Sequence, residues 1–241
     1  MNRKYTQGFT LIEIAIVLVI IGLLLGGILK GQELITSARV RNLIAQQDGV
    51  KAAFFGFQDR FRAFPGDYTA ASTNIVGIST TSGCGGAVNG NGNGNGRIEP
   101  LAGGLYENVL AWEHLSKAGF ITGTYTCAAV EGPTTSPVNP YGVNMQVVFD
   151  GIYGITSTGP TRHNIKTGSQ VPVDIIAEMD RKIDDGAPYT GGFQFSVYQG
   201  LGAAAPTEGN AATPACTSGN AISATWNATN GSTNCGGASL L

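Results

Sequence analysis

An unbroken apolar run opens the pattern of hydrophobic and polar positions along this chain. Residues 9–29 read FTLIEIAIVLVIIGLLLGGIL, and Glu13 is the one charged side chain within them. At a rise of about 1.5 Å per residue, a helix over this run would cover a hydrocarbon core of roughly 30 Å. A conventional secretory signal has a shorter apolar core followed by a small-residue cleavage site, and no such site stands out after Leu29. We therefore expect a helix that spans a membrane once.

Beyond this run the pattern changes to that of an amphipathic helix. The apolar positions that fall on one face, spaced four, three and four residues apart, are Val50, Phe54, Phe57 and Phe61. The segment Phe64-Pro65-Gly66-Asp67 supplies the stop, because the residue before a proline is pushed away from helical geometry. Residues 9–63 therefore predict one continuous helix, on the order of 80 Å long at about 1.5 Å per residue, whose second part packs on a sheet.

Two shorter helices are expected in the rest of the chain. Apolar residues recur every three or four positions in Leu105–Ala118, and Gly119 stands where a left-handed C-cap belongs. Another helix is expected after Pro172, closed by Asp184-Asp185-Gly186. Trp112, on the first of these helices, is predicted to be a core residue.

The strand signals follow in the second half of the chain. Residues 146–155 predict a β-hairpin that turns at Asp150-Gly151, and residues 193–198 predict a half-exposed strand. Residues 72–104 and the tail from Gly200 contain few large apolar side chains and are expected to be loops. The predicted fold class is α+β: a long N-terminal helix, membrane-spanning in its first half, packed on an antiparallel sheet head with Gly-rich loops.

Length, composition and charge limit the function. A chain of 241 residues holds one head and an anchor more readily than two full-size globular domains. Only 12 % of the residues are charged while Gly reaches 36 copies, a balance that favours loops. The net charge of -2 gives no global basic footprint, so nucleic acid is not indicated as a partner.

The four cysteines all follow the apolar run and have no CxxC spacing. They are Cys84, Cys127, Cys216 and Cys235. Two disulfides are expected, and of the three connectivities we favour Cys84–Cys127 with Cys216–Cys235, because each closes a loop between sequence neighbours. This places the head in an oxidising compartment outside the bacterial inner membrane. Four free buried thiols would instead fit a cytosolic fold.

Glu13 distinguishes the apolar run from a simple anchor. A carboxylate inside a membrane-spanning helix costs roughly 2.5–3.5 kcal/mol on insertion scales and normally needs a partner. No other residue from Phe9 to Leu29 is charged. The expected partner is therefore a chain terminus or another molecule.

The letters K…GFTLIE, at positions 4 and 8–13, resemble the class III signal of type IV pilins and type II secretion pseudopilins. The resemblance implies that a prepilin peptidase cuts between Gly8 and Phe9 and methylates the new amine. It also implies that Glu13 pairs with the N-terminal amine of a neighbouring subunit during assembly. The resemblance is specific over residues 1–30 and weaker beyond them.

This resemblance implies a layout and a location. Residues 1–8 form a leader, 9–29 the transmembrane and assembly helix, 30–63 its amphipathic continuation, and 64–241 the head. The chain is expected in the bacterial inner membrane with a cytoplasmic N-terminus, and then in a periplasmic or extracellular filament. The implied partners are the prepilin peptidase, other subunits, the inner membrane and the assembly machinery.

Three functions stay open. The first is a structural subunit of a type IV pilus or of a type II secretion pseudopilus. The second is a minor, tip-located pilin whose loops bind a surface, a secreted cargo or DNA. The third is an exported enzyme on an uncleaved anchor, which Glu13 and the Gly8–Phe9 junction disfavour because such an enzyme needs neither.

No catalytic motif is present in the sequence, so no enzyme is expected. His114 and His163 have no partner at metal-ligand spacing. Asp180, Asp184 and Asp185 lie close together in sequence, which is typical of a solvated helix end or a weak cation site.

One loop resembles the first nine positions of an EF-hand calcium loop. Its oxygen-bearing residues are Asn91, Asn93, Asn95 and Glu99. The twelfth position is Ala102 in place of a bidentate Glu, so Glu99 is the only formal charge unless Glu107 or a distant Asp folds in. We expect no cofactor, or calcium bound no tighter than about 10⁻⁴–10⁻³ M. The other reading is a flexible Asn-Gly loop that binds no ion.

Overall fold

A computed structural model describes residues 10–79, 90–100, 106–129, 131–209 and 215–241 of the chain. The chain divides into two compact units, Met1–Arg39 and Val40–Leu241. Helix α1, Leu11–Phe61, begins in the first unit and ends in the second.

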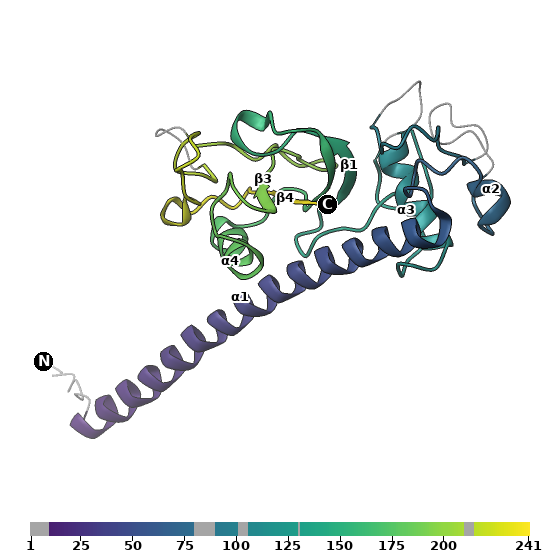
Figure 1. Cartoon of the computed structure of the whole chain (residues 1–241). Helices are drawn as coiled ribbons and strands as arrows, with labels where there is room; N and C mark the ends of the chain where they lie inside the picture. The colour runs from purple at the N-terminus through teal and green to yellow at the C-terminus, as the bar shows by residue number, and fades with distance from the viewer. Residues whose placement is uncertain (1–9, 80–89, 101–105, 130, 210–214) are drawn as a thin grey trace, which may run out of the picture. The chain divides into compact units, whose positions relative to one another are not determined.

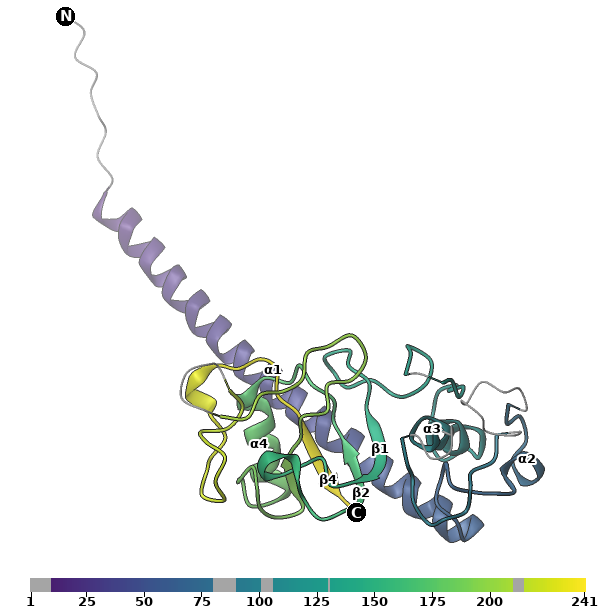
Figure 2. The same cartoon turned by 90° about the horizontal axis from the view of Figure 1, so that it is seen from above.

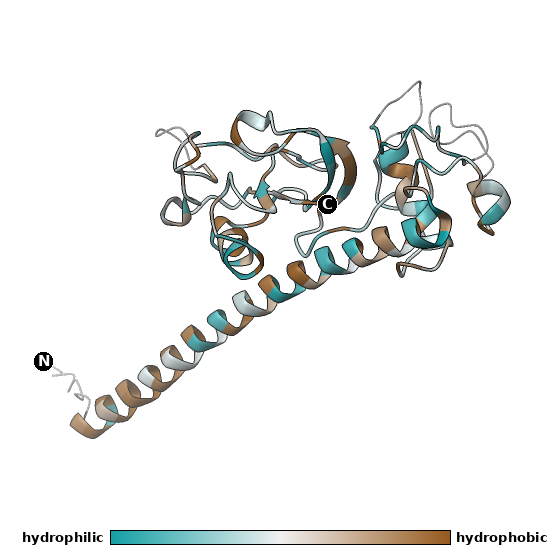
Figure 3. Ribbon diagram, in the orientation of Figure 1, coloured by the Kyte–Doolittle hydropathy of each residue, from teal (hydrophilic) through white to brown (hydrophobic). Residues whose placement is uncertain are grey.

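The first unit contains the apolar part of α1. Its large apolar side chains are exposed, from Leu11 at 92 % to Leu29 at 68 %. Figure 3 shows the hydrophobic colour over most of this part of the helix, with a mixed pattern further along. An apolar surface of this extent needs a covering of lipid or of other protein, because it is not buried within the unit.

The second unit is a mixed α+β head. Its helices are the last part of α1, α2 (Ala71–Asn74), α3 (Glu107–Lys117) and α4 (Val173–Ile183), with short 3₁₀ turns η1 (Ile155–Ser157) and η2 (Ala228–Asn230). Its strands are β1 (Gln146–Asp150), β2 (Arg162–Lys166), β3 (Phe193–Phe195) and β4 (Gly237–Leu240). They form one antiparallel sheet in the order β1-β2-β4-β3. Figures 1 and 2 show the head from two directions.

The last part of α1 contributes to two hydrophobic clusters. Val40 and Leu43 pack with α4, β3 and the segment around Trp226. Further along, Phe54 and Phe57 pack with α3 and with the strand residues of β1 and β2. The predicted apolar face is therefore confirmed: Val50, Phe54 and Phe57 are buried and Phe61 is partly buried.

The two short helices predicted in the head are confirmed as α3 and α4, whereas α2 lies at the start of the stretch 72–104 that was predicted to be a loop. Helix α3 carries Trp112, which is 1 % exposed, and Gly119 follows it with φ +82°. Helix α4 follows Pro172, which is its N-cap residue, and Gly186 has φ +77° in the turn beyond it. Positive φ values of this kind are readily adopted by glycine, which explains the two stops.

The predicted hairpin at Asp150-Gly151 is wrong. Strand β1 pairs with β2, so the connection runs through the whole stretch from Gly151 to Thr161 and contains η1. The chain does not reverse at Asp150-Gly151 because the loop closes further along, where the N–H of Gly159 donates to the carbonyl of Gly151 at 2.8 Å. The carboxylate of Asp150 accepts hydrogen bonds from Lys166 at 2.5 Å and Asn164 at 3.0 Å, which connects the end of β1 to β2.

The prediction that the whole tail from Gly200 is a loop is wrong. Its residues 237–240 form β4, which lies between β2 and β3 as an inner strand of the sheet. A Cβ on Gly237 would lie 2.1 Å from Cζ of Phe193, so only glycine fits against that ring. The predicted strand 193–198 is also shorter than expected, since β3 ends at Phe195.

Candidate functional site

The candidate functional segment is the start of α1. The predicted processing residues Gly8 and Phe9 lie outside the described residues. The first described residue is Thr10, and the helix begins at the next residue.

Glu13 is bound to Thr10 by three hydrogen bonds. The backbone N–H and the hydroxyl of Thr10 each donate to Oε2 of Glu13 at 2.8 Å. In return the backbone N–H of Glu13 donates to the hydroxyl of Thr10 at 3.3 Å. This reciprocal arrangement is a capping box, which satisfies amide groups that the first helical turn leaves free. The sequence contains its signature, Thr10-Leu-Ile-Glu13, and the sequence reasoning overlooked it.

The capping box changes the account of Glu13. The sequence argument required a partner from outside the segment, whereas Thr10 supplies a local one. Helix α1 is long and apolar enough to cross a membrane, and it is the one helix of the described ranges that meets this condition. Glu13 therefore lies in the first turn of α1, where its side chain is exposed and caps the start of the helix.

In the head, the Asn-Gly loop is held in place by two carboxylates from elsewhere in the chain. Asp67, which follows the end of α1, accepts the N–H groups of Asn95 at 3.0 Å and Gly96 at 2.8 Å. Glu107, the first residue of α3, accepts the N–H groups of Asn93 at 2.9 Å and Glu99 at 3.2 Å. The carboxylates of Asp67 and Glu107 thus accept backbone N–H groups of a loop that has no helix or strand of its own.

Burial and repulsion act on these carboxylates. Burial raises the pKa of Glu107 to about 7, against the lowering effect of the loop amides, and the negative charges of Asp67 and Glu99 raise it further. Burial also raises the pKa of Asp67. The sequence reasoning raised Glu107 as an extra ligand, but it missed the scaffold role of both residues. The sequence contained only a weak sign of this role, which is that each of the two acidic residues lies near the end of a predicted helix.

The side-chain oxygens of the predicted calcium ligands already accept hydrogen bonds within the head. Oδ1 of Asn91 accepts the N–H of Ser72, and Oδ1 of Asn93 accepts the N–H of Asn95. Oε2 of Glu99 accepts the side-chain amide of Asn95 at 2.8 Å. Each oxygen has a second lone pair, so calcium binding at Asn91, Asn93, Asn95 and Glu99 stays a prediction.

Both histidines are packed into the head. Gly66 N–H donates to Nδ1 of His114 at 2.9 Å, and Nε2 of His114 lies 2.9 Å from the Gly90 carbonyl oxygen. His163 contacts the rings of Phe54, Phe64 and Phe149. Burial lowers the pKa of each histidine to about 4. Both rings are therefore neutral at pH 7. His114 is held by its two hydrogen bonds, and His163 is held by its contacts with aromatic rings.

One disulfide is described. Cys216 is bonded to Cys235, with a Cα–Cα distance of 5.5 Å, which is the pairing favoured from the sequence. Cys235 in turn exchanges backbone hydrogen bonds with Val171, just before α4. Cys84 lies outside the described residues, so its pairing with Cys127 stays a prediction.

Three aspartates meet at the C-terminal end of α4. One carboxylate oxygen from each of Asp180, Asp184 and Asp185 lies within 4.8 Å of the others. Trp226 donates its indole N–H to Oδ2 of Asp180 at 2.6 Å. Burial raises the pKa of Asp180 to about 7, and this effect is larger than the lowering of the pKa by the hydrogen bond from Trp226.

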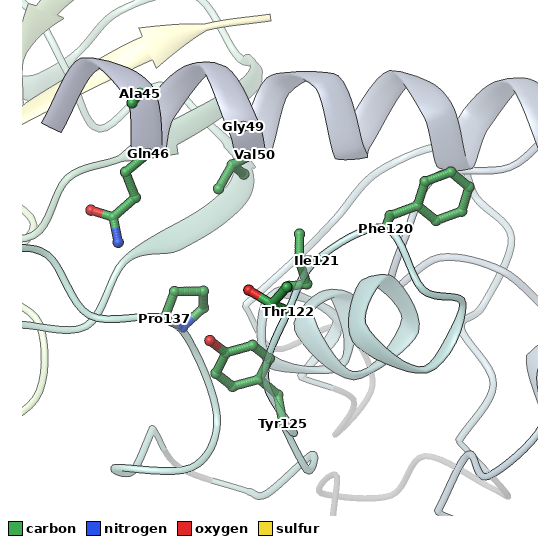
Figure 4. Close-up of a pocket in the computed structure, with 9 residues that line it drawn as sticks. All are labelled: Ala45, Gln46, Gly49, Val50, Phe120, Ile121, Thr122, Tyr125 and Pro137. Atoms are coloured by element: carbon green, nitrogen blue, oxygen red, sulfur yellow. The ribbon is translucent and has the colours of Figure 1, made fainter. Parts of the chain in front are cut away.

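A hollow of about 370 Å³ lies beside α1 in the head (Figure 4). Its lining comes from one side of α1 and from the segment after α3, and consists of Ala45, Gln46, Gly49, Val50, Phe120, Ile121, Thr122, Tyr125 and Pro137. The side-chain amide of Gln46 is used by the carbonyl of Val138, to which it donates at 2.7 Å. The lining has no carboxylate, imidazole or amine, so it provides no acid, base or metal ligand at pH 7 beyond neutral oxygens.

Comparison with protein families identifies the N-terminal segment. Residues 3–29 match the family model described as the prokaryotic N-terminal methylation motif. The comparisons with curated proteins and with solved structures give no match.

The matched segment includes Gly8, Phe9 and Glu13, which were singled out from the sequence. This motif is the signal of type IV pilins and pseudopilins, and the fold agrees with it: a long helix with an exposed apolar N-terminal part, whose last part packs with strand residues of a small antiparallel sheet. The chain therefore carries the N-terminal signal of the prepilin-like class.

Proposed function

We propose that this protein is a structural subunit of a type IV pilus or of a type II secretion pseudopilus, polymerised through its N-terminal helix. The observation that supports this most directly is the methylation motif at residues 3–29, followed by a helix whose apolar side chains are exposed. In this role a prepilin peptidase removes residues 1–8, and α1 then moves from the inner membrane into the filament. The head, kept in an oxidising compartment, is stabilised by its disulfide.

The chemistry of α1 fits both of these environments. Lipid and a bundle of neighbouring α1 helices each cover an apolar surface, whereas water does not. Glu13 gains a strong partner only in the second environment, where the N-terminal amine of a neighbouring subunit can bind its charge. A buried pair of opposite charges then replaces a single exposed carboxylate, which favours assembly over the isolated anchor.

Processing is tested by mass spectrometry of the protein made with and without a prepilin peptidase. We expect the mature chain to begin at Phe9, with one added methyl group, only when the peptidase is present. A chain that keeps Met1, or that begins beyond Leu29, would contradict the proposal.

A minor, tip-located subunit is the second candidate. What supports it is the head, in which long Gly-rich connections are fixed by Asp67, Glu107 and a disulfide instead of by regular structure. A subunit repeated throughout a filament has to pack closely with its own copies, and such connections are less suited to that. Quantitative mass spectrometry of purified filaments separates the two: a large fraction of the protein mass indicates the main subunit, and a few copies indicate a minor one.

The proposed function is not catalytic, and any binding role would lie in the head. Calcium at Asn91, Asn93, Asn95 and Glu99 is included as a weak site, with an affinity no tighter than about 10⁻⁴–10⁻³ M because Glu99 is its only carboxylate ligand. Titration calorimetry of the parent chain and of Glu99→Ala measures it. Identical heats for the two chains would remove this loop as a calcium site.

A further inference from the structure

The group of Asp180, Asp184 and Asp185 is built into the head at the end of α4. Asp180 lies in the last turn of the helix, Asp184 is its C-cap residue, and Asp185 follows in the turn. One oxygen from each carboxylate lies within 4.8 Å of the other two. The C-terminal end of a helix adds partial negative charge to this place, so the electrostatic environment favours a cation.

Two of the three carboxylates are fixed by the turn that follows the helix. Asp184 accepts the N–H of Phe193 at 2.8 Å through Oδ2. Asp185 accepts the N–H of Ala187 at 2.9 Å through Oδ1 and the hydroxyl of Thr190 through Oδ2. Gly191, with φ +72°, leaves room for the Asp184 carboxylate, since a Cβ there would lie 2.0 Å from Oδ2. The cluster is therefore preorganised and does not depend on a chance meeting of mobile side chains.

The buried member of the group has an oxygen without a partner. Asp180 is 0 % exposed, and its Oδ2 is bound by the indole N–H of Trp226. Its Oδ1 is buried and forms no hydrogen bond within the described residues, although the amide of Gly186 acts on the same carboxylate. A buried carboxylate oxygen without a donor is costly, and the cost is removed when a cation binds it.

We propose that Asp180, Asp184 and Asp185 bind a divalent cation of the calcium type. All the side-chain ligands are oxygens, which suits hard cations, and carboxylates placed irregularly around a helix end suit the flexible coordination of calcium better than the octahedral demand of magnesium. Water or backbone carbonyl oxygens would complete the coordination. The ion would join the end of α4 to the turn before β3 and, through Trp226, to the disulfide-bonded tail.

This site is separate from the Asn-Gly loop and does not depend on the filament role. With three carboxylates it has more ligand charge than the loop, which has only Glu99, so it is expected to bind calcium more tightly. It also has a spectroscopic reporter. Because the indole of Trp226 is hydrogen-bonded to Asp180, a terbium ion in the site would lie close enough to be excited through that ring.

The test uses the full chain in detergent micelles. Calcium is titrated by calorimetry, and terbium binding is followed by luminescence on excitation of tryptophan, with calcium as the competitor. The variants are Asp184→Asn and Asp185→Asn, which remove charge and keep shape. The matched control is Asp174→Asn, an exposed aspartate in the first turn of the same helix. Glu99→Ala tests the Asn-Gly loop in parallel.

We expect a saturable calcium site that is tighter than the Asn-Gly loop in the parent chain and in Asp174→Asn, with its dissociation constant raised about tenfold or more in Asp184→Asn and Asp185→Asn. Trp226→Phe should lose the terbium signal, and magnesium should compete poorly. Circular dichroism of each variant establishes that it is folded before it is titrated.

The proposal is overturned if the parent chain shows neither calcium heat nor terbium luminescence at millimolar ion, because Asp180 would then be a buried acid without an ion. It is equally overturned if folded Asp184→Asn and Asp185→Asn bind calcium as the parent does. Binding that is lost only in Glu99→Ala would place the ion in the Asn-Gly loop instead.

Discussion

At the scale of single residues, Glu13 has two properties that substitutions can separate: it accepts hydrogen bonds from Thr10, and it carries a negative charge. Glutamine at this position keeps an acceptor oxygen for the capping box but has no charge. Valine removes both. The pair Glu13→Gln and Glu13→Val therefore asks whether assembly needs the charge or only the helix cap.

We expect both variants to insert into the membrane at least as well as the parent, the valine variant by roughly 2–3 kcal/mol on insertion scales. Both should enter sheared filaments poorly, because the pairing with a neighbouring amine requires the charge. Glu33→Gln, on the exposed part of the same helix, is the control and should assemble normally. If Glu13→Gln assembled like the parent and only Glu13→Val failed, the cap and not the charge would be the requirement.

His163 predicts a pH dependence of stability. Its pKa is lowered by burial to about 4 from an ordinary value near 6.5, and its Nε2 has no hydrogen-bond partner in the described part of the chain. The unfolded chain therefore binds a proton more readily than the folded chain between these values. By linkage the stability contributed by the neutral ring is present above pH 6.5 and is lost as the pH falls towards 4, by up to about 3 kcal/mol.

His163→Phe should keep the aromatic contacts with Phe64 and Phe149 and remove this loss. Denaturant unfolding of the parent and the variant at pH 7 and pH 4.5 measures the effect, and the two chains should differ in the pH dependence more than in stability at pH 7. If the stability of the two chains fell in parallel between pH 7 and pH 4.5, the imidazole of His163 would not be the group responsible for the loss.

At the scale of elements, β4 depends on close packing and not on strand propensity. Gly237→Val should destabilise the head by about 2–3 kcal/mol or more, because the new side chain collides with the ring of Phe193. Gly219→Ala is the control, since nothing lies within 4 Å of a Cβ at that position. Thermal unfolding of the two variants should show a large fall in melting temperature for the first and little change for the second.

The sequence was informative where local periodicity decides the structure, and uninformative where distant residues do. The faces of α1, α3 and α4 and their glycine stops follow from spacing and from φ preferences, so they were predictable. Strand β4 reads Gly-Ala-Ser-Leu, which has no strand signal, and its place is decided by contacts with β2 and β3. The Asp150-Gly151 cue failed for a similar reason, since the loop is closed by a residue further along the chain, Gly159, whose N–H donates to the carbonyl of Gly151.

The candidate site divides in the same way. Residues Gly8, Phe9 and Glu13 belong to one short motif, so a single pass along the sequence finds them. The carboxylates of Asp67 and Glu107 meet the Asn-Gly loop from separate parts of the chain, and no spacing rule connects them. Such contacts become visible only when the fold brings the segments together.

At the scale of the whole molecule, the disulfide closes a loop within the tail from Gly200, and backbone hydrogen bonds between Cys235 and Val171 connect that loop to the rest of the head. Cys216 and Cys235 are 19 residues apart. A double change to serine should lower the free energy of unfolding by about 3 kcal/mol, because the unfolded chain gains conformational entropy when the cross-link is removed. Thr233→Ala, an exposed change in the same loop, is the control. Non-reducing peptide mapping of the parent would also test the predicted pairing of Cys84 with Cys127, and four free thiols would contradict both that pairing and the oxidising compartment.

The inner position of β4 sets an order for closing the sheet. The strand that separates β2 from β3 follows both of them along the chain, so the sheet remains open until residues 237–240 are available to pair. Until then β2 and β3 each present an unpaired edge, which is the kind of surface that recruits other strands or proteases. A head in which β4 has not yet paired is therefore a better target for chaperones and proteases than the completed sheet, and binding of either would be expected to stop once β4 is in place.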